Sequence, residues 1–400
     1  MTIPRRIPFG DLRVGPLARA KIEAALSRNW ISEGENVREF EEKFAAKFRW
    51  KHAVATSSGT DAGIVVWSAI SELDISGGRS LIRSDEEHDH IRTRYVLTPA
   101  CAFTSTANCL LASNLIPWFI DIDLETLNIS LVNLITKLNA HPSEIFLGDI
   151  LGFQFVATMG KPTPVREVAL LAKVHDLYIV GDWCEAHGAM LDKPADHYAD
   201  ATIYSFFAAH MIVAGEGGMI CTDDDEIAAL CRSIKCHGYG PGPRFDFARI
   251  GYNSKMNELT AAIGLEGLEK FDETFARRRE VREKLIDRLS RFEDRLILYR
   301  EEPGEVIAPH AFPIVMRDPA ADVMPLYHHL EENGIQCKTL FGSLPTQHKA
   351  FAFLGHALRD FLVAERVGRT GLHFSCSEYL TDDDIDYIAE QVGEGLKKSC

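Results

Sequence analysis

The stretch from Tyr204 to Gly218 reads YSFFAAHMIVAGEGG and decides how the rest of the chain is interpreted. Its apolar beginning is typical of a buried strand, and its glycine-rich end is typical of a tight turn. Ser205 and His210 lie five residues apart between these two features. A lone histidine after an apolar strand is more often a structural residue than a catalyst. The role of His210 therefore depends on the motifs that surround it.

Strand-like and helix-like patterns alternate on both sides of this stretch. Strand-like runs stand at 53–56, 95–99, 117–123 and 177–181, and helical spacing of apolar residues appears at 37–48 and 165–174. This alternation predicts an α/β fold, with a large domain at 1–275 whose mostly parallel sheet has helices on both faces. The order helix, strand, helix after that point predicts a smaller C-terminal α+β domain at 276–400.

Composition excludes several classes of function. The net charge of -15 argues against a surface that binds nucleic acid or an anionic membrane. Nine cysteines without CxxC pairs predict free thiols in a reducing compartment and no metal site. The cluster of acids and histidines at 84–90 lacks regular ligand spacing and is interpreted as a solvated loop. No apolar run reaches the ~18 residues of a membrane span, so we expect a soluble, cytoplasmic protein.

Two motifs place polar groups at the ends of predicted strands. A helix that starts near Thr60, within the run SGTDA at 58–62, would direct free backbone N–H groups at an anion such as a phosphate. Simple N-capping is the alternative at this position. Asp182 follows the strand at 177–181, where side chains of parallel sheets point into ligand-binding crevices, although it could instead cap the next turn. Three arginines at 277–279 stand among acids and are interpreted as an exposed helix face without a site role.

Six motifs in this order resemble one family of enzymes. They are the segments at 30–34, 58–62, 182–188, 215–218, 251–253 and 364–366. Together they resemble the sugar aminotransferases and dehydratases among the fold type I pyridoxal phosphate (PLP) enzymes, which act on nucleotide-linked keto-sugars. The resemblance covers nearly the whole chain and implies the aspartate aminotransferase-like fold.

The resemblance implies a cofactor site with eight residues: Gly59, Thr60, Asp61, Phe103, Asp182, Glu185, Ser205 and Asn253. Asp182 would pair with the protonated pyridine nitrogen, so that the ring can withdraw electrons. Phe103 would stack on the ring, and Glu185 would approach its hydroxyl group.

The same resemblance implies how the cofactor phosphate is held. Backbone amides of Thr60 and Asp61 would bind it together with the Ser205 hydroxyl. Asn253 would reach the phosphate from the partner subunit, so the resemblance also implies a homodimer.

One residue departs from the aminotransferases of this family. In those aminotransferases, the residue five positions after the serine is the lysine that forms a Schiff base with the cofactor. In this chain that residue is His210. Histidine cannot form that bond, so the cofactor is expected to be held noncovalently, most naturally as pyridoxamine phosphate (PMP). With an ordinary pKa of about 6.5, His210 could still act as the general acid and base.

The exchange of lysine for histidine resembles the nucleotide-sugar 3-dehydratases of 3,6-dideoxysugar pathways, as does the segment at 335–342. The resemblance implies loss of the 3-hydroxyl group from a nucleotide-linked 4-keto-6-deoxy sugar, with glutamate as the amino donor. Relatives with a two-iron cluster carry a cysteine-rich insertion, whereas here only Cys231 and Cys236 stand in that region, which favours the branch without a cluster. The alternatives are an aminotransferase-like enzyme that works without the lysine, or a noncatalytic relative that binds a nucleotide-sugar.

Overall fold

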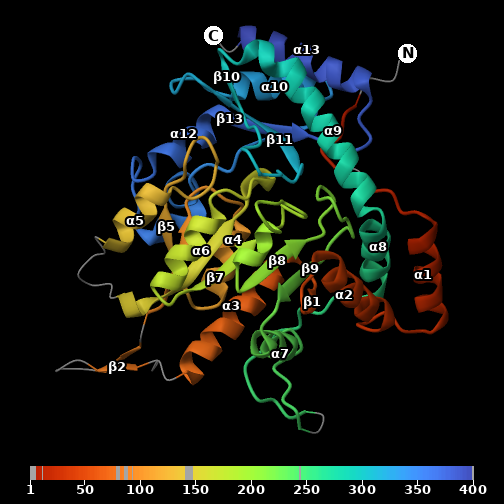
Figure 1. Ribbon diagram of the computed structural model, residues 1–400, viewed down its shortest axis with the longest axis vertical. Helices are drawn as coiled ribbons and strands as arrows, with labels where there is room; N and C mark the ends of the chain where they lie inside the picture. The colour runs from red at the N-terminus through yellow and green to blue at the C-terminus, as the bar shows by residue number, and fades with distance from the viewer. Residues whose placement is uncertain are drawn as a thin grey trace.

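A computed structural model describes residues 6–10, 12–77, 82–84, 89–91, 93–139, 147–242 and 245–398. Within the loop predicted at 84–90, residues 85–88 lie outside the described residues. Figure 1 shows two layered bodies, with the first and last described residues near the same end of the molecule. None of the helices in the described part of the chain is long and apolar enough to cross a membrane.

The large body is built on a seven-stranded sheet that is mostly parallel, as predicted. In spatial order its strands are β1 (His52–Thr56), β9 (Gly218–Thr222), β8 (Ala201–Ser205), β7 (Tyr178–Asp182), β6 (Ile150–Val156), β4 (Tyr95–Pro99) and β5 (Ile116–Ile120). The strands from β8 to β5 are parallel, and β9 runs antiparallel to both of its neighbours. The carboxyl ends of β7 and β8 therefore meet at one edge of the sheet.

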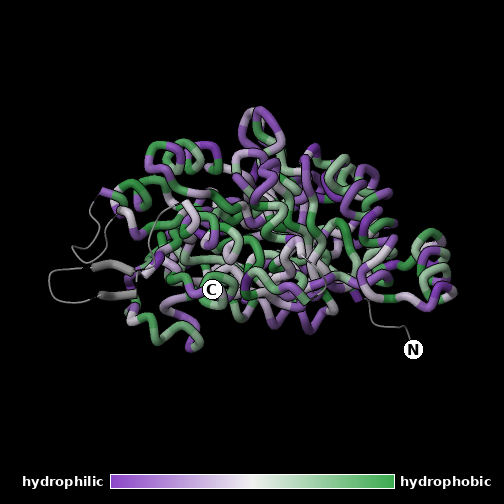
Figure 2. Tube along the Cα trace, turned by 90° about the horizontal axis from the view of Figure 1, so that it is seen from below, coloured by the Kyte–Doolittle hydropathy of each residue, from purple (hydrophilic) through white to green (hydrophobic). Residues whose placement is uncertain are grey.

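Helices cover both faces of this sheet, as the sequence predicts. They are α2 (Glu35–Phe48), α3 (Gly59–Ser76), α4 (Ser105–Ala112), α5 (Leu131–Asn139), α6 (Val165–Val174), α7 (Asp225–Ile234) and α8 (Glu258–Glu269), while α1 (Pro16–Ser27) packs on the outside of α8. Successive residues of a strand point to opposite faces. Tyr204 of β8 accordingly packs with Phe44 of α2, while Ile203 lies in the cluster that contains Val65 of α3. Figure 2 shows apolar and polar residues alternating along the outer helices.

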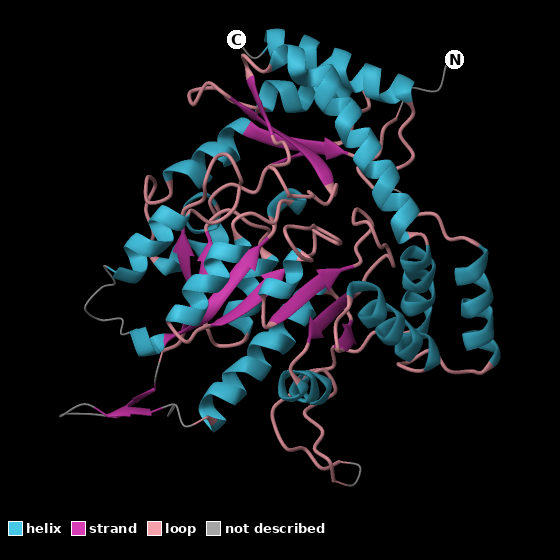
Figure 3. Ribbon diagram, in the orientation of Figure 1, coloured by secondary structure: helices cyan, strands magenta, loops and turns pink. Residues whose placement is uncertain are grey.

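The second body carries an antiparallel sheet of four strands, visible above the large sheet in Figure 3. Its strands are β10 (Leu296–Leu298), β11 (Ala311–Met316), β13 (Gly371–Ser375) and β12 (Cys337–Thr339), and its helices are α10 (Met324–Glu332), α11 (Leu344–Gln347), α12 (Leu362–Thr370) and α13 (Asp382–Lys398). A reciprocal pair of hydrogen bonds between Thr381 and Asp384 caps α13. A short hairpin of β2 (Ile82–Ser84) and β3 (Asp89–Ile91) stands apart from both sheets.

One long helix, α9 (Phe271–Leu289), joins the two bodies. Phe271 and Phe275 pack against the core of the large sheet, whereas Val281 and Leu285 belong to the core of the small sheet. The predicted boundary between residues 275 and 276 falls inside this helix and stays a prediction. Ile7, from the beginning of the chain, also packs into the core of the small sheet.

Candidate active site

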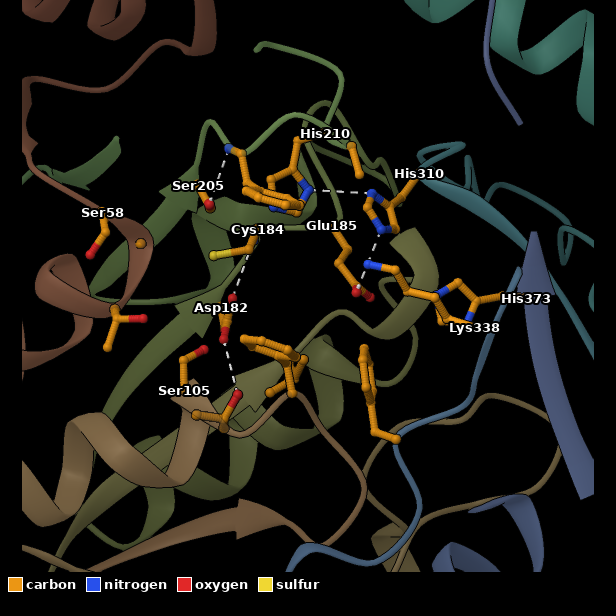
Figure 4. A pocket seen from close by; sticks show the side chains of 18 of the residues that line it. Ser58, Ser105, Asp182, Cys184, Glu185, Ser205, His210, His310, Lys338 and His373 are labelled. Atoms are coloured by element: carbon orange, nitrogen blue, oxygen red, sulfur yellow. Dashed lines mark hydrogen bonds and ion pairs between the residues drawn. The ribbon is translucent and has the colours of Figure 1, made fainter. Parts of the chain in front are cut away.

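A cavity of about 300 Å³ opens at the carboxyl ends of β7 and β8, and β12 and β13 close its other side. Figure 4 shows the side chains that line it. Most of the predicted site residues are among them, namely Gly59, Thr60, Phe103, Asp182, Glu185, Ser205 and His210. The fold thus brings together residues that are up to 151 positions apart in the sequence, counted from Gly59 to His210.

Asp182 ends β7 and presents a buried carboxylate to the cavity. One carboxylate oxygen accepts a hydrogen bond from the Thr106 hydroxyl, and the other accepts one from the backbone N–H of Cys184, both at 3.2 Å. Burial raises the pKa of Asp182 above the usual range of an aspartate. Among the described residues no basic side chain forms an ion pair with it, so this carboxylate suits a cationic ligand group.

The start of α3 lines the same cavity as Asp182. Gly59 lies so close to β8 that a Cβ there would meet Ser205 Cβ at 2.8 Å. Only glycine at position 59 therefore allows the first turn of the helix to lie close to the Ser205 hydroxyl. The N–H groups of this turn and the Ser205 hydroxyl together suit a phosphate, and we call them the phosphate cup. Ser58 caps the helix by accepting a hydrogen bond from the Asp61 amide at 3.0 Å.

Two predicted residues lie apart from the cavity lining. The Asp61 amide is already bonded to Ser58, so the N-capping alternative holds at that amide. Asn253 is exposed, and its side-chain oxygen accepts a hydrogen bond from Lys255 Nζ at 2.5 Å. The proposed roles of both residues toward the cofactor stay predictions.

Glu185 is half-buried just after β7, and its two oxygens have different neighbours. Oε2 accepts a hydrogen bond from the Met159 amide at 2.7 Å, and Oε1 lies 3.7 Å from His310 Nε2. Burial raises the pKa of Glu185 to about 7, and the negative charge of Asp182 contributes in the same direction. Glu185 can therefore change its protonation state near neutral pH.

His210 is buried in the turn that follows β8, with its backbone N–H donating to the Phe207 carbonyl at 2.9 Å. Its Nδ1 lies 3.3 Å from Nδ1 of His310, which precedes β11 in the other body. Burial, together with the positive charges of Arg278 and Lys338, lowers the pKa of His210 to about 3. The imidazole is therefore neutral at pH 7, and one of its two ring nitrogens carries no proton.

The interpretation of the arginines at 277–279 as an exposed helix face is wrong for Arg278. It is 4% exposed, and its guanidinium group donates to the carbonyls of Ala209, His210 and His310 at 3.3 to 3.5 Å. Its Nε also pairs with Glu378 at 2.7 Å. The helical spacing of Arg278 with Val281 and Leu285, which face the core, was the signal for its burial.

The second body supplies three titratable cavity residues that were not singled out from the sequence: His310, Lys338 and His373. Lys338 and His373 are direct partners on β12 and β13. His373 is 3% exposed, and burial and Lys338 lower its pKa to about 3. Of the three, only Lys338 lies in a segment that the family resemblance includes. Within the described ranges, no three His, Cys, Asp or Glu side chains are grouped so that they could hold a metal ion.

These features fit a pyridoxal phosphate cofactor. The uncompensated buried Asp182 suits a pyridinium N–H, the cup at Gly59 and Ser205 suits a phosphate, and the ring of Phe103, 58% exposed, can pack on a flat ligand. Fold and cavity together define a fold type I PLP-dependent enzyme. Residues 15–393 match the DegT/DnrJ/EryC1/StrS aminotransferase family, to which the chain belongs, and the cofactor of this family is PLP.

Similar proteins include both dehydratases and aminotransferase-family synthases. The chain is 28% identical over 418 residues to dTDP-4-dehydro-2,6-dideoxy-D-glucose 3-dehydratase of Saccharopolyspora spinosa, covering 95% of this chain and 84% of the relative. It is 26% identical to GDP-perosamine synthase of Escherichia coli O157:H7, covering 93% and 94%. A crystal structure of a GDP-4-keto-6-deoxymannose 3-dehydratase variant with bound GDP-perosamine superposes with a TM-score of 0.81 at 24% identity, covering 96% and 99%. The last comparison supports the shared fold.

Proposed function

We propose that the chain is a PMP/PLP-dependent 3-dehydratase of a nucleotide-linked 4-keto-6-deoxy sugar, with His210 as the acid and base. The observation that carries this proposal is a buried, neutral histidine on the cavity wall, five residues after Ser205. By resemblance, that is the position of the Schiff-base lysine in the aminotransferases. The only lysine among the described lining residues is Lys338, which stands on β12 of the other body.

Each site residue of the chain would have a separate role in this reaction. Bound PMP would supply an amino group and an electron-withdrawing ring. Asp182 would keep the ring nitrogen protonated, and the cup at Gly59, Thr60 and Ser205 would hold the phosphate. His210 would take a proton from carbon and give it to the departing 3-hydroxyl group, which leaves as water.

The substrate and partners are part of the same proposal. Relatives named for dTDP-linked and GDP-linked sugars are about equally similar, so the proposal leaves the nucleotide open. We take glutamate as the amino donor that regenerates PMP, and a homodimer in which Asn253 serves the partner's site. The eight cysteines of the described chain are free and six are buried, which is compatible with a mechanism without an iron cluster.

Mass spectrometry of products tests the proposal. The protein is incubated with PMP, glutamate and GDP-, CDP- or dTDP-linked 4-keto-6-deoxy sugars. We expect a 3-deoxy-4-keto sugar and ammonia from one of them, and a rate lower by a factor of about 10² to 10⁴ for His210→Asn, the usual contribution of a general base. An amino-sugar formed without loss of water would instead indicate an aminotransferase. Absence of cofactor binding would indicate a noncatalytic relative.

A further inference from the structure

The rings of His210 and His310 form the centre of a chain of contacts that ends on Glu185. His210 Nδ1 lies 3.3 Å from His310 Nδ1, and His310 Nε2 lies 3.7 Å from Glu185 Oε1. Figure 4 shows the three side chains in this order along one wall of the cavity. The second distance is long for a hydrogen bond, as catalytic contacts often are before a ligand binds.

Each neutral imidazole carries one N–H, and a hydrogen bond between the two Nδ1 atoms needs one of them protonated and the other bare, because two facing N–H groups would repel. If His210 Nδ1 donates, then His310 carries its proton on Nε2, where the ionised Glu185 can accept it. If His310 Nδ1 donates instead, its bare Nε2 faces a negative oxygen, which is unfavourable. An ionised Glu185 thus selects the tautomer in which His210 Nε2 is bare.

We propose that His310 and Glu185 are a proton relay that sets the tautomer of His210 and makes its Nε2 the base of the site. When Nε2 takes a proton, the Nδ1 proton of His210 passes to His310 Nδ1, and the Nε2 proton of His310 passes to Glu185 Oε1. Both histidines end neutral, and Glu185 holds the proton. In the reverse direction, His210 Nε2 gives its proton to the leaving group, while Glu185 returns a proton to His310 Nε2 and His310 Nδ1 returns one to His210 Nδ1.

The surroundings of the relay explain why His210 needs it. With a pKa of about 3, His210 alone would be a weak base at neutral pH, whereas the pKa of about 7 at Glu185 suits a proton acceptor. Arg278 and Lys338 disfavour a charged His210, and Arg278, together with any charge on His187 or His373, disfavours a charged His310. Glu185 itself faces Asp182 and Lys338. A relay that leaves neither histidine charged avoids this repulsion.

The backbone around the two rings is fixed. Arg278 donates to the carbonyls of both His210 and His310, and the guanidinium group thereby ties the turn after β8 to the segment before β11. Oε2 of Glu185 is held by the Met159 amide, which leaves Oε1 toward His310. His310 is 7% exposed, so water competes little for its nitrogens. His310 is accordingly a positioning residue that acts through His210.

Nitrogen NMR of the full-length, cofactor-loaded protein with ¹⁵N-labelled histidine tests the relay, with His210 signals assigned from His210→Gln. We expect His210 to carry its proton on Nδ1 with Nε2 bare, at a pH above the pKa of Glu185. In His310→Phe the proton should distribute over both nitrogens. A proton on Nε2 of wild-type His210 at that pH would overturn the relay, and this result needs no variant to fold.

Kinetics supply the second readout, which rests on the proposed function. His310→Phe and His310→Asn should each lower kcat about 10- to 100-fold, with KM changed less than about twofold. This decrease in kcat is smaller than the full contribution of a general base, because His210 itself remains in place. His329→Gln, at a buried histidine remote from the cavity, should leave kcat unchanged. If the wild type dehydrates a sugar and both His310 variants keep its kcat, the relay is wrong. If the wild type dehydrates none, the proposed function fails while the NMR result still decides the tautomer.

Discussion

Asp182 carries a carboxylate that folding buries without a basic partner among the described residues. The raised pKa means that its ionised form is disfavoured in the folded chain. Ionisation of Asp182 therefore lowers the stability of the fold. This loss is absent at a pH below the pKa of the carboxyl group in the unfolded chain, and it develops as the pH rises through the higher pKa of the folded chain. A cationic ligand group at this position would remove that penalty, which links the stability of the protein to binding.

Asp182→Asn is therefore expected to have two effects of opposite sign. At about pH 7 the cofactor-free variant should be more stable than the wild type by ~1 kcal/mol, because a poorly compensated charge is removed. Its affinity for PMP should be roughly 10- to 100-fold lower, because a charge-assisted hydrogen bond is lost. Urea unfolding and absorbance titration measure the two quantities. A cofactor-free variant that is less stable at pH 7 would contradict this account of Asp182.

Glu185 is expected to control how activity depends on pH. Its ionised form is the one that accepts a proton, and its pKa is about 7, so kcat/KM should rise as the pH increases through about 7. No separate step is expected near the ordinary histidine pKa of about 6.5, because the pKa of His210 is about 3. A pH profile of the wild type beside Glu185→Gln measures this. A step near 7 that persists in the variant would rule out Glu185 as its origin.

Several site residues could be predicted from the sequence because local patterns place them. Asp182 follows an apolar strand, and the SGTDA run precedes a helix, so both lie where parallel sheets bind ligands. His310 and His373 could not be predicted in this way. They reach the cavity only because the second sheet packs over the first, and nothing in their local sequence indicates that distant contact.

At the scale of elements, α9 connects the two bodies and also fixes the site. Its apolar positions predicted a helix, but the run of three arginines at 277–279 suggested a solvated face. Arg278 lies on the buried face, one turn before Arg282, while Arg279 lies on the outer face and pairs with Glu301. Several strands and helices followed from apolar periodicity, whereas β6 and β9 of the large sheet were not predicted, and β8 ends at Ser205, within the apolar beginning of the stretch at 204–218.

Arg278→Met should loosen the turn that holds His210. Removing one partner of a buried ion pair is expected to lower the free energy of unfolding by about 3 to 5 kcal/mol, since Glu378 loses its partner. Arg279→Met is the matched control on the same helix, with an expected loss of at most about 1 kcal/mol from its half-buried pair with Glu301. Chemical unfolding of both variants gives the comparison. Equal losses would show that the buried contacts of Arg278 add nothing.

At the scale of the whole molecule, the predicted homodimer is the feature that a single chain leaves untested. Asn253 is exposed and apart from the cavity of its own chain, which is compatible with a role in a partner's site. Composition led to the expectation of a cytoplasmic protein, and that expectation stays a prediction. The overall α/β architecture, by contrast, was predictable because strand and helix patterns alternate along the whole large domain.

Mixing two inactive variants tests whether Asn253 acts across the interface. In a mixed dimer of His210→Asn and Asn253→Ala chains, one site has both residues intact if Asn253 comes from the partner. Random reassociation of equal amounts should then restore about a quarter of wild-type activity, since half of the dimers are mixed and each has one intact site. If both residues act within one chain, the mixture stays inactive.

If His210 stands in the place of the Schiff-base lysine, the bound cofactor is not attached to the chain. Borohydride reduction of the PLP-loaded protein, followed by mass spectrometry of its peptides, tests this most directly. We expect PLP to remain removable from the wild type, while His210→Lys becomes labelled at residue 210 and shows that the method detects attachment. A pyridoxyl group fixed on any lysine of the wild-type chain, Lys338 included, would contradict the account.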